Sequence, residues 1–199
     1  MIIAKSLDRH GNRNWEVTTA PLIEPISVDE VKLFARIDGT DEDTLLQGFI
    51  KAVREAMENY LGRALIEQTI KMTMDHWPDN PVKLPMPPLI SVTQIVTLDE
   101  DDTETVYSTD SYYVHTLTTP GQIVIKHGAT PPTNTDRYYG GYRVDYKAGY
   151  GTSTADVPQS IREAMKLWCS IYYETRTLTE IPPNEVLSII DRNYRIPRI

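Results

Sequence analysis

Cysteine and histidine are scarce in this sequence. Among its 199 residues there is one cysteine, Cys169, and there are four histidines. A single cysteine excludes an intrachain disulfide and a cluster of thiolate metal ligands. No two histidines have the i, i+2 or i, i+4 spacing by which a strand or a helix presents a metal site; they are His10, His76, His115 and His127. We therefore predict no bound metal ion.

The sequence also lacks the motifs of common enzymes. It contains no G-x-S-x-G nucleophile elbow, no P-loop and no complete G-x-G-x-x-G phosphate loop. The acidic run from Asp99 to Glu104 fails as a calcium loop, because its sixth position is Glu104 instead of glycine and its twelfth is Asp110 instead of glutamate. We expect this run to be a solvated hairpin tip, and we predict no catalytic residues, no cofactor and no enzyme activity.

Long apolar runs and excess positive charge are absent as well. No stretch approaches the roughly 20 apolar residues of a membrane span, so no membrane partner is expected. Residues 1–5 have no signal-peptide core, which favours synthesis and residence in a cytoplasm. The net charge of −8 disfavours a protein that coats nucleic acid, although a mildly acidic wall would suit a channel through which DNA passes.

Four segments have the periodicity and the end signals of helices. Ser27 and Glu30 form a capping-box pattern before a helix to about Ile37, with Gly39 as its expected stop. Thr40 is the expected cap of a second helix that ends at Gly62, with apolar residues at spacings of three and four. A third helix is predicted from about Val157 to Thr175. A short fourth helix opens at Pro183 and includes Val186, Leu187, Ile189 and Ile190.

The intervening region has the composition of strands. Its short segments are rich in β-branched and aromatic residues and are separated by turn-rich stretches: 69–74, 90–98, 112–115, 121–126 and 142–148. The pattern predicts a small antiparallel β module of about five to six strands. Residues 1–20 are predicted to be an arm that orders against a neighbour, or to hold a short strand around Trp15 to Val17.

These elements predict an α+β protein. Two separated helical segments each carry one apolar face that neither can bury alone. We expect residues 21–66 and 157–199 to form one small helical bundle, in which Phe49, Val53, Met57, Ile161, Met165 and Trp168 are buried together. Residues 67–152 form the inserted β module, and residues 1–20 the N-terminal arm.

Tyrosine is concentrated in the β module, which contains eight of the twelve. Because tyrosine combines apolar area with a polar tip, it is enriched at protein interfaces. Strands also favour tyrosine whatever their function, and a glycan-binding surface is a third interpretation. As a possible subunit or partner surface we select Tyr112, Tyr138, Tyr139 and Tyr142.

The order of several short motifs resembles a known family. P-I-S-V-D-E-V-K at residues 25–32 leads into D-E-D-T-L-L-Q-G-F-I-K-A-V-R-E-A-M-E-N-Y-L-G-R at 41–63. P-L-I-S-V-T-Q-I at 88–95 and Y-R-V-D-Y-K-A-G-Y-G at 142–151 follow, and V-P-Q-S-I-R-E-A-M-K-L-W at 157–168 and Y-E-T-R at 173–176 close the series. Over about residues 20–195 the chain is similar to the head–tail connector, or adaptor, proteins of long-tailed phages and gene transfer agents, in the version with a β insertion.

This resemblance implies a function and a set of partners. Subunits of that family form a dodecameric ring under the portal protein, so the expected partners are the portal, further copies of the chain and a tail-side connector or terminator protein. DNA would pass without sequence-specific binding, in a virion assembled from protein made in the bacterial host cytoplasm. The main alternative is a carbohydrate-binding or host-recognition module that uses the tyrosine-rich β insertion.

The resemblance also assigns portal docking to the C-terminal segment. That segment is more apolar than a free tail should be, and its arginines would add charge-assisted contacts to a partner. The residues expected to dock are Val186, Leu187, Ile190, Arg192, Tyr194, Arg195, Ile196 and Arg198. The alternative is that a fourth helix simply caps the bundle.

Overall fold

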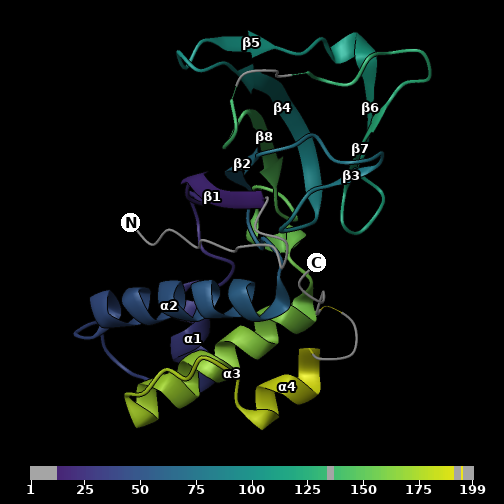
Figure 1. Ribbon diagram of the computed structural model, residues 1–199. Helices are drawn as coiled ribbons and strands as arrows, with labels where there is room; N and C mark the ends of the chain where they lie inside the picture. The colour runs from purple at the N-terminus through teal and green to yellow at the C-terminus, as the bar shows by residue number, and fades with distance from the viewer. Residues whose placement is uncertain (1–12, 134–136, 191–193, 195–199) are drawn as a thin grey trace. The chain divides into compact units, whose positions relative to one another are not determined.

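The computed structural model describes residues 13–133, 137–190 and 194. The chain divides into two compact units, one helical and one built of strands. Of the described residues, 21–66, 150–190 and 194 belong to the helical unit, whereas 13–20, 67–133 and 137–149 belong to the β unit. The predicted α+β class is confirmed: four helices and two antiparallel sheets are present among the described residues (Figure 1).

Helices α1 (Val28–Ala35) and α2 (Asp43–Leu61) differ in the interactions at their ends. The capping box before α1 is confirmed, because the Ser27 hydroxyl accepts the Glu30 amide and the Glu30 carboxylate accepts the Ser27 amide. Arg36, in the left-handed region, ends α1 before Gly39 is reached. The prediction that Thr40 caps α2 was wrong, because the N-cap residue is Glu42. The Glu42 carboxylate accepts hydrogen bonds from Tyr173 and Arg176 and makes none to the backbone amides of α2.

Helices α3 (Gln159–Thr175) and α4 (Asn184–Ile190) complete the helical unit. Helix α3 packs against α1, α2 and α4 (Figure 1). The six residues predicted to share a core all lie in one buried cluster, and the Phe49 ring stacks on Tyr172 with centroids 4.1 Å apart. This cluster joins segments separated by the whole β unit, as their matched apolar spacing indicated.

One ion cluster is buried in the helical unit. Arg54 on α2 donates hydrogen bonds to Glu24 and to Glu58, at 2.7 and 2.8 Å. The Glu58 carboxylate also accepts the backbone amide of Leu65 at 2.8 Å, just beyond the end of α2. Burial raises the pKa of Glu58 to about 7, against the lowering effect of Arg54. The cluster therefore fixes the segment through which the chain leaves α2.

The β unit contains two sheets, which is more than the single module of five to six strands that the sequence predicted. The five-stranded sheet has the order β1-β2-β8-β4-β5, and the three-stranded sheet has the order β3-β7-β6. All neighbours are antiparallel. The strands are β1 (Arg13–Thr19), β2 (Gln68–Met74), β3 (Val82–Lys83), β4 (Leu89–Leu98), β5 (Glu104–Val106), β6 (Tyr112–His115), β7 (Gln122–Ile125) and β8 (Tyr142–Ala148).

Of the two possibilities for the N-terminal residues, the described part takes the strand. Residues 13–19 form β1 at the edge of the five-stranded sheet, paired with β2. Strands β3 and β5 were not predicted, because two or three residues are too few to show a period of two. Alternate residues of β2 and β8 are buried, so the five-stranded sheet has one apolar and one polar face.

We expect Met57→Ala to lower the free energy of unfolding by about 2–5 kcal/mol, because Met57 is fully buried and its truncation leaves a cavity. Leu33→Ala is the matched control on the surface of the same unit, since Leu33 is 84% exposed. It should change stability by less than about 0.5 kcal/mol. Urea unfolding followed by circular dichroism measures both, and equal effects would contradict the assignment of this core.

We also expect the Cys169 thiol to be inert in the folded protein. Burial on α3 raises its pKa to about 12, so almost no thiolate forms near neutral pH. A thiol reagent such as Ellman's reagent should react at pH 8 only at the rate of unfolding, and rapidly in denaturant. Immediate reaction with one equivalent in native buffer would show that the thiol is accessible.

Candidate interaction surfaces

Helix α4 belongs to the helical core. Val186 and Ile190 are completely buried in the cluster that α2 and α3 build, whereas Leu187 is only half-buried. All three lie on α4, whose apolar side faces the core. Val186 and Ile190 therefore cap the helical bundle, which was the alternative to docking on a partner. These two side chains are therefore unavailable to a partner as long as the unit is folded.

Tyr194 is held beyond the end of α4. Its carbonyl accepts a hydrogen bond from Arg63 Nε at 2.5 Å, and its hydroxyl accepts one from the Ser160 hydroxyl at 2.9 Å. Arg63 also donates to the Tyr150 hydroxyl at 3.3 Å, and burial raises the pKa of Tyr150. These contacts fix the point from which the last residues of the chain start. The other predicted docking residues, Arg192, Arg195, Ile196 and Arg198, lie outside the described residues.

The four tyrosines selected from the sequence do not form one surface. Tyr112 and Tyr142 are 6% and 7% exposed, whereas Tyr138 and Tyr139 are 83% and 80% exposed. Tyr112 opens β6 and Tyr142 opens β8, each at an inward-facing register position. Burial raises the pKa of Tyr112. Tyr112 and Tyr142 are thus removed from the predicted partner surface, and Tyr138 and Tyr139 remain on it.

Tyr138 and Tyr139 lie in a loop that Arg137 organises. The Arg137 guanidinium donates to the Tyr139 carbonyl at 2.9 Å and to the Asp99 carbonyl at 3.3 Å, and it pairs with the Asp102 carboxylate. The Gly140 amide donates to Asp75 Oδ1 at 2.7 Å, in a backbone conformation with φ +64°. Two adjacent aromatic side chains are consequently held out into solvent by a fixed loop.

The acidic run is the tip of the β4–β5 hairpin, as predicted. Asp99 Oδ1 accepts the amides of Asp101 and Thr103 at 3.0 and 2.8 Å, which closes the turn. The residues between the strands, including Glu100 and Asp101, are exposed. Because Arg137 pairs with Asp102 and bonds the Asp99 carbonyl, this tip and the tyrosine loop form one surface. We call residues 99–102 with Tyr138 and Tyr139 the acidic corner.

The outward face of the three-stranded sheet has the opposite charge. The register places Lys83, Gln122 and His115 in one row across β3, β7 and β6, and Val124 beside Tyr113 in the next. Lys126 Nζ lies 4.8 Å from the centre of the Tyr113 ring. Within the described residues neither lysine pairs with a carboxylate. We call these six residues the basic face.

An open hollow of about 400 Å³ adjoins the basic face. It is lined by Asn80, Pro81, His115, Thr118, Gln122 and Val124. The sequence did not reveal this face, because its two lysines are 43 positions apart and share a face only through the register, which sets Lys83 opposite Gln122, four residues before Lys126. Arg137 was missed for the same reason, since its partners Asp99 and Asp102 are distant in the chain.

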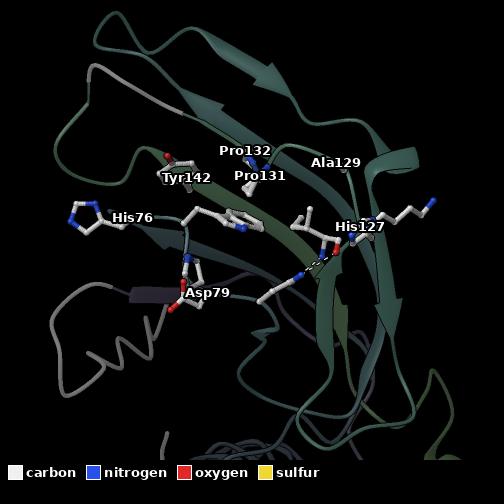
Figure 2. Close-up of a pocket in the computed structure, with 12 residues that line it drawn as sticks. His76, Asp79, His127, Ala129, Pro131, Pro132 and Tyr142 are labelled. Carbon is white, nitrogen blue, oxygen red and sulfur yellow. Dashed lines mark hydrogen bonds between the residues drawn. The ribbon is translucent and has the colours of Figure 1, made fainter.

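A second cavity, of about 560 Å³, lies within the β unit (Figure 2). His76 and Asp79 lie on one side of it and His127 on the other, with Pro131 and Pro132 above. Of the tyrosines selected from the sequence only Tyr142 lines it, and Tyr142 is buried against Trp77, with ring centroids 5.9 Å apart. The exposed Tyr138 and Tyr139 do not line it.

The part of the chain that the structure describes holds no cluster of metal-ligand side chains. Within it, no three His, Cys, Asp or Glu side chains come together as a metal site requires. No described helix is long and apolar enough to cross a membrane.

Comparison with known proteins gives the class. Residues 24–181 match the family described as head completion protein. The fold is similar to chains in the neck of an empty GTA (gene transfer agent) particle computed with C6 symmetry and in the virion of a native GTA particle. The TM-scores are 0.77 and 0.76, each at 24% identity over 93% of this chain and 96% of the other. No curated protein sequence matches significantly.

A third structure has the same fold. It is a chain in the neck of a native GTA particle computed with C12 symmetry, with a TM-score of 0.72 and 22% identity over 92% of this chain and 96% of that one. The fold and the family match together define a virion protein of the head–tail connector class. The chain belongs to the head completion protein family, which confirms the resemblance drawn from the motifs.

We expect Arg63→Ala to release Tyr194. The substitution removes the bond from Arg63 Nε to the Tyr194 carbonyl, and a charged hydrogen bond contributes about 1.5–3 kcal/mol. Local opening at Tyr194 should rise about tenfold or more, and chymotrypsin cleavage after Tyr194 with it. Lys51→Ala, an exposed change on α2, is the control. Mass spectrometry of timed digests reports the rate; no difference between the two variants would mean that Arg63 does not hold Tyr194.

Proposed function

We propose that this chain is a head–tail connector subunit that assembles as a ring beneath the portal of a phage-like particle. In this position it joins the DNA-filled head to the tail and forms part of the channel through which DNA passes. The observation that carries the proposal is the head completion match over residues 24–181. The shared fold with neck chains in particles computed with C6 and C12 symmetry supports a ring of twelve copies.

The composition is compatible with a channel wall. The net charge is −8, and phosphate binding requires clustered free cations. On the polar face of the five-stranded sheet the cations are already paired: Lys71 with Glu16, Arg143 with Glu104 and Asp145, and Lys147 with Glu67. A wall whose cations are neutralised lets DNA slide past without holding it.

The C-terminal segment is the proposed portal-docking element. Val186 and Ile190 are buried in the core. The residues that remain for docking are therefore Leu187, Tyr194 and the arginines on either side of Tyr194. Arginine donors suit carboxylate or carbonyl acceptors on a partner. Tyr194, anchored by Arg63 and Ser160, gives this element a fixed origin on the subunit. A tail-side connector or terminator protein would bind elsewhere on the ring.

We expect truncation after Tyr194 to leave the fold intact and to prevent the chain from joining portal-bearing heads. The cut removes five residues but leaves Val186, Ile190 and the Arg63 contact in place. Truncation after Pro182 is a poorer test, because it removes two fully buried core residues. Thermal unfolding checks the fold, and negative-stain counts of completed heads measure function.

Arg195→Glu/Arg198→Glu in the full-length chain tests the charge contribution separately. It should reduce head completion while leaving the unfolding temperature unchanged. Arg36→Glu/Lys51→Glu, which makes the same charge change at two exposed residues of the helical unit, is the control. If heads are completed normally by the chain truncated after Tyr194, the docking assignment is wrong.

A further inference from the structure

The acidic corner has the features of a preformed binding surface. Single exposed aromatic residues are ordinary, but Tyr138 and Tyr139 are adjacent and more than three-quarters exposed. Arg137 and Asp75 fix the backbone that carries them. Ordering a loop before binding lowers the entropy lost on association, and tyrosine is among the residues that dominate interface energetics. The loop therefore displays two anchors in advance of a partner.

The charge of the corner defines what that partner must offer. Arg137 links Asp99, Glu100, Asp101 and Asp102 to the tyrosine loop, and it pairs with the carboxylate of Asp102. A complementary surface needs unpaired cations at its rim and an apolar or aromatic hollow for the rings. The basic face of the three-stranded sheet meets both requirements in this same chain, through Lys83 and Lys126, the Tyr113 ring and the adjoining hollow.

We propose that the acidic corner of one copy of this chain docks onto the basic face of the next copy. The proposal rests on the proposed ring and names the contact that its β units make. Tyr138 and Tyr139 enter the hollow beside Val124 and Gln122, while Glu100 and Asp101 approach Lys83 and Lys126. The occupant of the basic face is thus a second copy of the chain.

The positions of the two surfaces suit a head-to-tail contact. The β4–β5 turn and the three-stranded sheet lie on opposite sides of the β unit (Figure 1). A contact between two different surfaces can repeat from copy to copy and forms a ring when its rotation closes, whereas a twofold contact would stop at a dimer. The corner and the face are different in charge and shape, so neither is self-complementary.

A cross-linking experiment tests the contact. The chain carrying both Glu100→Cys and Thr118→Cys places one thiol at the corner and one at the hollow, and it leaves the tyrosines and lysines in place. Cys169 does not react with the cross-linker, because it is buried and its pKa is about 12. A short bismaleimide should convert this chain into a ladder of multimers, in concentrated protein at low salt and in purified particles. Chains with either substitution alone should give no ladder.

Disruption and control variants make the result specific. Lys83→Glu/Lys126→Glu, added to the double-cysteine chain, should reduce the ladder at least tenfold, and Tyr138→Ala/Tyr139→Ala should do the same. Arg36→Glu/Lys51→Glu, with the same charge change in the helical unit, should leave it unchanged. The pair Glu100→Cys with Asn14→Cys, an exposed position on β1, should not cross-link.

The outcomes separate this inference from the proposed function. Completed particles that contain the double-cysteine chain but yield no ladder would overturn the docking contact and leave the connector role standing. A ladder that survives both disruption variants would also overturn it. Absence of the wild-type chain from completed particles would instead overturn the proposed function.

Discussion

The hydrogen bonds around Leu65 are the constraint on which the rest of the helical unit depends. The chain leaves this unit near Leu65 and returns to it at Tyr150, and the Tyr150 amide donates to the Leu65 carbonyl at 3.2 Å. The Leu65 amide in turn donates to Glu58, which Arg54 holds. Both crossings of the chain are thereby tied to α2. The tie therefore holds the two chain crossings next to each other, at the end of α2.

The helices could be predicted because their signals are local. The capping box at Ser27 and the three-and-four spacing on α2 and α3 depend only on nearby residues, and they gave both the elements and their common core. The N-cap of α2 was misplaced: it is Glu42, whose carboxylate bonds the distant Tyr173 and makes no bond to the first amides of the helix. Local patterns identify where a helix belongs, but they do not show which side chain, more than 100 positions away in sequence, bonds the residue at its start.

The surfaces were harder to predict, because they depend on register. Composition indicated that the β module was rich in tyrosine, but it did not separate the buried Tyr142 from the exposed Tyr139 three positions earlier. Lys83 and Lys126 gave no joint signal until β3 and β7 were paired. The apolar residues of α4 suggested docking, since a seven-residue helix has little periodicity to reveal that Val186 and Ile190 fill the core.

The pairing of β2 with β8 also bears on how the protein folds. Gln68 and Ala148 are register partners, so a folded β unit brings the two ends of the insertion side by side. Closing a loop costs free energy that grows with the logarithm of its length, and α2 and α3 are about 100 residues apart in the chain. Formation of the β2–β8 pair shortens that loop to roughly 18 residues and lowers its closure cost by about 1.5 kcal/mol. A folded insertion thus lowers the entropic cost of bringing together the two helices that it separates in the chain.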